Sequence, residues 1–236
     1  MEKNDINTAL ISGKIEELFG NGFIERSKDW IDRYKKLMAY YRCAMMEVET
    51  KLNVLNEEFS LRHDRNPIND IRSRLKNHLS IKEKLERRGL ELTPESIEEN
   101  LSDVAGIRVI CSFPEDVYTI SNALLSQDDV TLIEKKDYIR NPKKNGYRSL
   151  HLIVKVPIFL AHEKRSMKVE IQLRTIAMDV WASLEHQLHY KKDFDFTEEM
   201  ANELIYCASL SAELDSRMDA LRNLVSLSEK EEEINK

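Results

Sequence analysis

Two acidic residues stand apart from the many solvated ones because each lies at or within an apolar segment. Asp103 precedes the apolar run VAGIRVICSF, and Glu170 lies in the alternating segment MKVEIQLRT, where it shares the polar side with Gln172. Carboxylate oxygens are the ligands that Mg²⁺ prefers, so we expect both residues to face a cleft where a divalent cation meets phosphates. Taken singly, a carboxylate in such a position is more often a helix-flanking or edge-strand residue than a catalytic one.

Basic residues are concentrated in two segments of a chain whose net charge is −6. Residues 72–88 hold seven Lys or Arg against two acidic residues, and residues 134–148 hold six against two. Two basic segments in an acidic chain indicate a focused anion site and not a broad surface for duplex nucleic acid. The sequence has neither a Walker A motif nor a G-x-G-x-x-G motif, so side-chain cations must bind the phosphates. Either segment alone could also be a solvated helix face or loop.

Spacing within these segments suggests what each one binds. Ser80, Lys84 and Arg87 fall at i, i+4 and i+7 of an expected helix, and a face of this kind can line a chain of phosphates. In the second segment an Asn-Gly pair permits a tight turn beside Tyr147, whose ring offers a flat face to a base. A hairpin turn with solvated lysines would leave this tyrosine without a role.

Hydrophobic periodicity predicts the elements that position these groups. Apolar residues spaced three and four apart predict a long amphipathic helix over about residues 30–59. Further helices are expected over about residues 77–88, from Pro94 with Thr93 as N-cap, and over 114–125, 176–191 and 198–226. Strands are expected over 104–113, 130–139, 149–159 and 167–175. This order predicts an α/β (α+β) fold, a mixed sheet of four to five strands flanked by helices, with long N-terminal and C-terminal helices.

Composition favours one domain in a reducing cytoplasm. Glycine (6) and proline (5) are scarce, which argues against long low-complexity linkers. The three cysteines are odd in number and lie far apart, which argues against a disulfide framework and a zinc site. The first residues lack a basic stretch followed by an apolar run, and the most apolar segment is broken by Lys155 and Pro157. We therefore expect a protein that is neither exported nor membrane-spanning.

Four ordered segments together resemble the synthetase domain of the RelA/SpoT family. They are RSRLKNHLSIKEKLERRG, LSDVAGIRVICSF, DYIRNPKKNGYRSLH and VEIQLRTIAMDVWASLEH. The chain resembles a small alarmone synthetase, and CSF and RTIAMDVWASLEH look closer to the RelP branch than to the RelQ branch. The resemblance implies a synthetase core over residues 64–192, preceded by a helical region over 1–63 and followed by another over 193–236.

The resemblance implies a (p)ppGpp synthetase of the stringent response, that is, a GTP diphosphokinase. Such an enzyme transfers the β,γ-pyrophosphate of ATP to the 3′-hydroxyl of GDP or GTP and releases AMP, with Mg²⁺, or Mn²⁺ in its place, as cofactor. The chain contains no nucleophile motif, and a phosphoryl-type transfer needs positioning and charge neutralisation more than it needs a covalent nucleophile. His63-Asp64 resembles the metal-binding pair of the hydrolase domain in long family members, but the upstream residues are too few to form that domain. No hydrolase activity is expected.

Carried over by motif, the resemblance assigns a role to each candidate residue. The adenine of ATP is sandwiched by Arg74 and Arg108, and its phosphates are bound by Lys76, Ser80, Lys84 and Arg87. Asp103 matches the metal ligand, and Glu170 matches the second carboxylate, which completes the metal site or activates the 3′-hydroxyl. Tyr147 matches the residue that stacks on guanine, and the other groups around the acceptor nucleotide are Lys143, Asn145, His151 and Gln172.

Two other classes of function stay open on sequence alone. One is a toxin-like relative that pyrophosphorylates the 3′ end of tRNA, and the other is an inactive nucleotide-binding or RNA-binding module. The set of ATP-side cations from Arg74 to Arg87 favours the enzyme acting on free nucleotides. Single-stranded RNA stays open as a partner. The apolar stripes of the first and last helices exceed what a small sheet can cover, so we expect a homo-oligomer, and the resemblance implies a tetramer.

Overall fold

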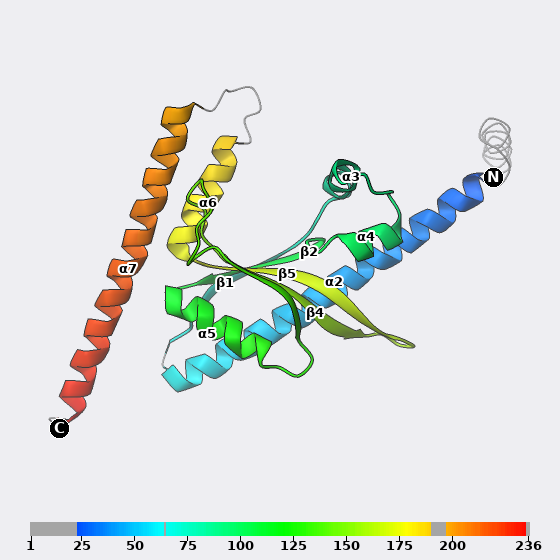
Figure 1. The fold of residues 1–236 in the computed structure, drawn as a ribbon. Helices are drawn as coiled ribbons and strands as arrows, with labels where there is room; N and C mark the ends of the chain where they lie inside the picture. The colour runs from blue at the N-terminus through cyan, green and yellow to red at the C-terminus, as the bar shows by residue number, and fades with distance from the viewer. Residues whose placement is uncertain (1–22, 64, 190–196, 235–236) are drawn as a thin grey trace, which may run out of the picture. The chain divides into compact units, whose positions relative to one another are not determined.

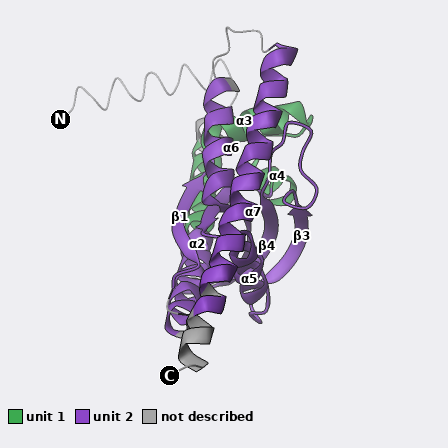
Figure 2. Ribbon diagram, turned by 90° about the vertical axis from the view of Figure 1, so that its left-hand side faces the viewer, with its two compact units in different colours: residues 1–42, 77–101 green, residues 43–76, 102–236 purple. Residues whose placement is uncertain are grey.

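The chain divides into two compact units. A computed structural model describes residues 23–63, 65–189 and 197–234. Unit 1 holds residues 1–42 and 77–101, and unit 2 holds residues 43–76 and 102–236 (Figure 2). The first helix, α2 (Phe23–His63), contributes its beginning to unit 1 and its remainder to unit 2.

Unit 1 combines the first part of α2 with two short helices, α3 (His78–Arg87) and α4 (Pro94–Asn100). Side-chain caps begin both short helices: Asn77 Oδ1 accepts the Ser80 backbone N–H at 2.7 Å, and Thr93 Oγ1 accepts the Ser96 backbone N–H at 3.1 Å. The expected N-cap at Thr93 is confirmed. Trp30 Nε1 donates to a backbone carbonyl of the loop between α3 and α4 at 3.0 Å, which attaches that loop to α2.

Unit 2 is built on a five-stranded mixed sheet in the order β1-β2-β5-β4-β3. The strands are β1 (Ile68–Leu75), β2 (Ala105–Cys111), β3 (Thr131–Asp137), β4 (Leu150–Phe159) and β5 (Lys164–Thr175) (Figure 1). Strands β2 and β5 pair in parallel, and the other neighbours are antiparallel. The predicted mixed sheet flanked by helices is therefore confirmed. The strand that sequence analysis left unassigned is β1, a largely exposed edge strand rich in polar residues.

Three helices complete unit 2: α5 (Pro114–Leu125), α6 (Ile176–His189) and α7 (Glu198–Ile234). The last two residues expected for the 176–191 helix lie outside the described part of the chain. Helix α5 and the 43–63 part of α2 lie on one side of the sheet, whose apolar face includes the fully buried Val169, Ile171 and Leu173 (Figure 1). Among the described residues, no helix combines the length and apolar character that a membrane span requires.

Buried polar contacts attach α7 to the rest of unit 2. Thr175 Oγ1 donates to Asp215 Oδ2 at 2.8 Å and accepts the Met178 backbone N–H at 3.1 Å, so one hydroxyl holds α7 and caps the start of α6. Burial of Asp215, which belongs to α7, raises its pKa, because water solvates the ionised carboxylate less well in a buried position. Further along α7, Arg222 pairs with Glu115 at the start of α5.

Candidate active site

The registers of the sheet align part of the candidate set in two neighbouring rows. One row crosses the five strands as Arg72, Arg108, Gln172, His151 and Lys136, and the next as Arg74, Gly106, Glu170, Ile153 and Glu134. Residues directly opposite each other, and residues two apart along a strand, project from the same face of a sheet. Arg74 and Arg108, assigned to the adenine, therefore share one face of unit 2 with His151 and Gln172, two of the residues assigned to the acceptor.

Glu170 lies near the middle of this face, and both of its carboxylate oxygens contact neighbouring side chains. Its Oε2 accepts from Gln172 Nε2 at 3.1 Å, and its Oε1 lies 3.5 Å from His151 Nδ1. Burial by itself would raise the pKa of Glu170, but the contacts with His151 and Gln172 outweigh burial and lower that pKa below its ordinary value. The side chain is thus ionised at neutral pH.

Asp103 is the second carboxylate of the site and pairs with Lys76. Lys76 Nζ donates to Asp103 Oδ2 at 2.7 Å, with only 16% and 21% of the two side chains exposed. The charge of Asp103 also acts on Glu170, where it opposes the lowering of the pKa, so the two carboxylates are close enough to interact. Mg²⁺ is commonly held by one or two carboxylates together with substrate phosphates. Two ionised oxygen donors of this kind fit such a cation.

The loop between β3 and β4 makes the tight turn that Asn145-Gly146 predicts. Gly146 has φ +88°, and its N–H donates to the Lys143 carbonyl at 2.8 Å. Asn145 shapes the loop from both ends of its side chain, because Oδ1 accepts the Tyr147 backbone N–H and Nδ2 donates to Glu185, each at 3.2 Å. Asn145, which the resemblance assigns to the acceptor nucleotide, therefore also holds the turn closed.

A cavity of about 220 Å³ opens beside this loop. It is lined by Glu134, Lys136, Tyr138, Lys143, His151, Ile153 and Glu170. Lys143 Nζ lies 4.7 Å from the ring centroids of both Tyr138 and Tyr147, a cation–π arrangement that holds positive charge against the aromatic rings. The cavity thus combines cations, aromatic rings and two carboxylates, which suits a charged ligand that carries a planar ring.

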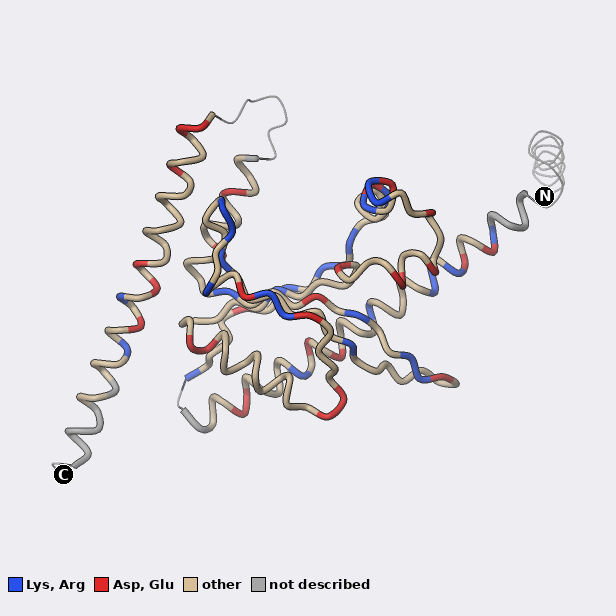
Figure 3. The backbone as a smooth tube through the Cα atoms, viewed as in Figure 1, with Lys and Arg blue, Asp and Glu red and all other residues tan. Residues whose placement is uncertain are grey.

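Sequence analysis did not select Glu134, Tyr138 or Ile153 as site residues, and it counted Lys136 only as part of a basic segment. The signal that locates Glu134, Lys136 and Ile153 is the spacing of two along β3 combined with the pairing of β3 to β4. Tyr138 follows Lys136 at the same spacing, directly after the strand. The other basic side chains of this segment include Arg148, which donates to the Ile139 carbonyl at 3.4 Å, and Arg140, which lies over the Tyr118 ring. Figure 3 shows Lys and Arg along this connection between β3 and β4. These two arginines support the loop.

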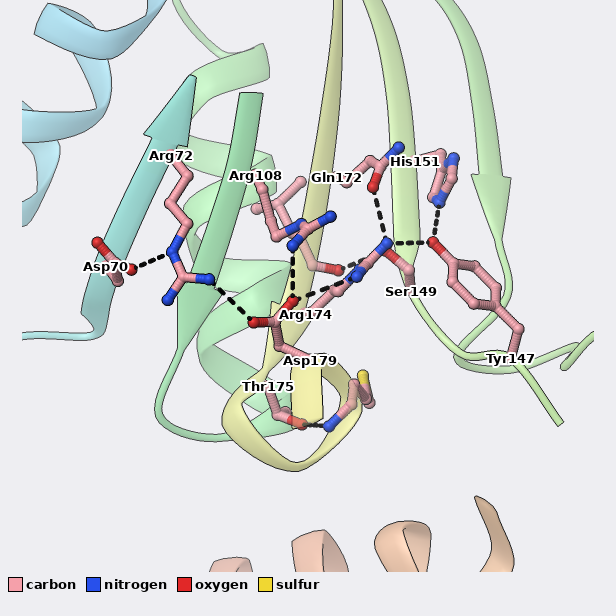
Figure 4. Close-up of polar contacts among 12 residues, drawn as sticks. Asp70, Arg72, Arg108, Tyr147, Ser149, His151, Gln172, Arg174, Thr175 and Asp179 are labelled. Carbon is pink, nitrogen blue, oxygen red and sulfur yellow. Dashed lines mark hydrogen bonds and ion pairs between the residues drawn. The ribbon is translucent and has the colours of Figure 1, made fainter. Parts of the chain in front are cut away.

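Arg174 follows Gln172 by two residues on β5, on the same side of the strand, and it is buried there at 4% exposure. Its Nη2 donates to Tyr147 Oη at 2.6 Å and to Gln172 Oε1 at 2.7 Å (Figure 4). Its Nη1 donates to Asp179 Oδ1 at 3.2 Å, and the same oxygen lies 3.3 Å from Arg108 Nη1. Burial and the neighbouring charge of Arg174 lower the pKa of Arg108. Neither Arg174 nor Asp179 was a candidate on sequence grounds.

The remaining ATP-side candidates lie on α3 in unit 1. Ser80 and Lys84 are half-buried and Arg87 is exposed, whereas Ile81 and Leu85 on another face of the helix are fully buried. The helix therefore has an apolar face that is buried and a separate face that carries the three polar candidates. In unit 2, Arg74 is exposed on β1.

Cations, two carboxylates and an aromatic loop around one sheet face are features of a nucleotide-binding enzyme. Residues 73–195 match the family described as a region found in RelA/SpoT proteins. Among curated proteins, GTP pyrophosphokinase YwaC of Bacillus subtilis is 40% identical over 84% of this chain and 94% of its own length. GTP pyrophosphokinase YjbM of the same organism is 32% identical over 82% of this chain and 90% of its own length.

Solved structures agree with the sequence comparison. Small alarmone synthetase 2 from Bacillus subtilis matches with a TM-score of 0.73 and 39% identity, over 80% of this chain and 98% of that one. Small alarmone synthetase 1 from the same organism, bound to its product pppGpp, matches with a TM-score of 0.74 and 33% identity, over 81% and 97%. The chain belongs to the RelA/SpoT family, as its four motifs predicted. The higher identity to YwaC agrees with the expected closeness to the RelP branch.

The close approach of Gly146 to α7 generates a prediction for Gly146→Ala. An added Cβ would lie 2.4 Å from Ala208 Cβ, and the backbone is left-handed at φ +88°. A left-handed residue other than glycine costs roughly 1–2 kcal/mol, and the clash adds to that cost. Gly146→Ala should therefore lower the Tm measured by calorimetry more than Gly89→Ala does, because Gly89 is also left-handed at φ +66° but meets nothing within 4 Å.

Ala208→Gly provides the matched rescue of this clash. Added to Gly146→Ala it should recover part of the lost Tm, although by itself it weakens α7 by roughly 1 kcal/mol through helix propensity. Two outcomes would show that the loop does not pack on α7 in this way. One is an equal loss of Tm in Gly146→Ala and Gly89→Ala. The other is a double variant whose change in Tm is the simple sum of the changes in Gly146→Ala and Ala208→Gly.

Proposed function

We propose that this protein is a (p)ppGpp synthetase that transfers the β,γ-pyrophosphate of ATP to the 3′-hydroxyl of GDP or GTP and releases AMP. The supporting observation is that Glu170, the adenine-side Arg108 and the acceptor-side His151 project from one sheet face in a member of the RelA/SpoT family. Relatives covered along almost their whole length are GTP pyrophosphokinases, and one similar structure holds pppGpp.

Each candidate side chain has a physical role in this reaction. Arg74 and Arg108 hold the adenine, and the ATP phosphates meet Lys76 and the α3 side chains Ser80, Lys84 and Arg87. Tyr147 stacks on the guanine, with Lys143, Asn145, His151 and Gln172 around the acceptor. Bound to Asp103 and Glu170, Mg²⁺ or Mn²⁺ would supply positive charge against the phosphates. Ionised Glu170 either completes that metal site or accepts the proton of the 3′-hydroxyl.

The assembly and location of the protein are part of the proposal. Apolar side chains on α6 are spaced by four and half exposed, among them Val180, Leu184 and Leu188, and a second exposed series on α7 includes Leu214 and Met218. These two adjacent helices thus carry apolar stripes that no described residue of the chain covers, which favours a homo-oligomer. The family resemblance favours a tetramer. The cysteines Cys43, Cys111 and Cys207 are free thiols, in keeping with a reducing cytoplasm. The synthetase core is proposed to span residues 64–192.

The proposed activity predicts dependence on a divalent cation and on both carboxylates. Purified protein should convert radiolabelled ATP with GDP or GTP to AMP and a 3′-pyrophosphorylated nucleotide, resolved by chromatography, and a chelator should stop the conversion. Asp103→Asn and Glu170→Gln should each abolish transfer while keeping side-chain shape. Asp70→Asn, which removes the charge of a half-buried carboxylate paired with Arg72, should keep activity. Turnover in chelator, or labelling of a tRNA 3′ end in place of the nucleotide, would contradict the proposal.

The proposed stacking of Tyr147 on the guanine predicts that removal of its ring impairs the use of GDP or GTP and spares the binding of ATP. Stacking of a base on an aromatic side chain is worth roughly 1–3 kcal/mol, so Tyr147→Ala should lower kcat/KM for GDP or GTP by about five-fold to over a hundred-fold. The affinity for ATP, measured alone by calorimetry, should barely change. Tyr147→Phe keeps the ring but loses the hydroxyl that contacts Arg174 and His151, so it should retain acceptor affinity and lose part of kcat. Equal damage to ATP and acceptor binding in Tyr147→Ala would make the loop merely structural.

The exposed apolar stripe of α7 predicts the oligomeric state. Light scattering at micromolar concentration should give a tetramer, and Leu214→Glu combined with Met218→Glu should give smaller species, because each charge would be buried in the interface. Glu213→Lys, a charge change beside the stripe at a residue that pairs with Arg217, serves as the control. A monomeric mass for the unaltered protein would contradict the proposed homo-oligomer.

A further inference from the structure

Arg174 contacts three side chains of the candidate site, although nothing in the activity described so far assigns it a role. It is among the few buried charged residues of the described chain, and its side chain is 5% exposed. A guanidinium is a donor only, with its N–H groups fixed in one plane, so each contact specifies which atom of the partner must accept. The directions of the neighbouring hydrogen bonds follow from this.

The first path from Arg174 runs through Gln172 to Glu170. Gln172 Oε1 accepts from Arg174 Nη2 at 2.7 Å, which fixes the orientation of the amide. The Gln172 Nε2 group must then face the other way, where it donates to Glu170 Oε2 at 3.1 Å. Arg174 therefore determines that Gln172 presents a donor, and not an acceptor, to Glu170.

The second path runs through Tyr147 and His151 to the other oxygen of Glu170. Tyr147 Oη accepts from Arg174 at 2.6 Å, which leaves its own proton for His151 Nε2 at 2.8 Å. A histidine that accepts at Nε2 carries its proton on Nδ1 in the neutral form. That nitrogen lies 3.5 Å from Glu170 Oε1. Figure 4 shows both paths leaving the guanidinium, toward Gln172 and toward Tyr147.

Asp179 keeps the guanidinium in place from the opposite side. It lies at the beginning of α6, with its side chain 12% exposed, and its Oδ1 accepts from Arg174 Nη1. The same oxygen lies 3.3 Å from Nη1 of Arg108, the residue assigned to adenine. The Asp179 carboxylate thus compensates the buried charge of Arg174 and also contacts Arg108.

We propose that Arg174 is a positioning residue for transfer, which fixes both oxygens of Glu170 through Gln172 and through Tyr147 and His151, with Asp179 holding the guanidinium. This inference rests on the proposed function, because Glu170 matters for turnover only if the transfer takes place. It differs from the roles carried over from the family in that Arg174 is assigned to neither nucleotide and acts through other side chains. Its effect should appear in kcat and in the position of the Glu170 carboxylate, while ATP binding is preserved.

The first test is Arg174→Lys, which keeps the charge but loses the planar set of donors. Changes in residues that orient a functional group typically cost 10–100-fold in activity, so kcat should fall by about that factor while KM for ATP stays within about two-fold. Arg65→Lys is the matched control, because Arg65 makes a two-bond pair with buried Asp116 away from the cavity. It should lower the Tm and leave kcat unchanged. Unchanged kcat in Arg174→Lys, or a loss explained by unfolded protein, would overturn the proposal.

The second test cuts the two paths and keeps Arg174. Gln172→Leu combined with Tyr147→Phe should lower kcat as much as Arg174→Lys, and adding Arg174→Lys to that pair should cause no further loss. Losses that multiply would mean that Arg174 does not act through these residues. Crystal structures of Arg174→Lys and the unaltered protein give a readout independent of turnover. Gln172 and His151 should turn away from Glu170 in the variant, and unmoved side chains would overturn the inference. Absence of product from the unaltered protein would instead refute the proposed function.

Discussion

The buried charge of Arg174 is the constraint on which the arrangement of the site depends. An ion removed from water costs several kcal/mol unless its partners compensate it, and Arg174 recovers that cost only where Asp179, Gln172 and Tyr147 meet it together. These partners come from α6, from β5 and from the loop before β4. Because the guanidinium donors have fixed directions, the three elements are held in one mutual arrangement. Glu170 takes its orientation from the same set of bonds.

The C-terminal helix contributes to this arrangement without touching the cavity. Trp181 of α6 donates to the Leu204 carbonyl of α7 at 3.0 Å, and Tyr147 packs against the buried cluster of Trp181 and Ala208. Gly146 leaves no space for a side chain between the loop and α7. Helix α7, which follows the proposed synthetase core in the sequence, therefore packs against the proposed guanine-binding loop. Assembly through the exposed stripes of α6 and α7 would restrain the same two helices.

Sequence patterns predicted the sheet and the polar face of β5, but not the groups that complete the site. Strict alternation placed Glu170 and Gln172 on one side of the strand, because side-chain direction along a strand has period two. The alignment of Glu170 with Gly106 and Ile153 depends on a parallel pairing to β2 and an antiparallel pairing to β4, which no local pattern encodes. Strand β1 escaped prediction because an exposed edge strand needs no apolar alternation. The burial of Arg174 could not be predicted, since α6, which supplies Asp179, covers it only in the folded chain.

The cations assigned to the substrates are held by protein partners as well. Lys76 pairs with Asp103, Arg108 with Asp179, and Lys143 lies against two tyrosine rings. Lysine and arginine have many rotamers, and ordering each on binding would cost roughly 0.5–1.5 kcal/mol. Partners that already restrict these side chains reduce that cost, because a phosphate then meets cations close to their bound positions. The carboxylates that balance the charge of these cations thus also restrict their side chains, and Asp179 does so for Arg108 and Arg174 at once.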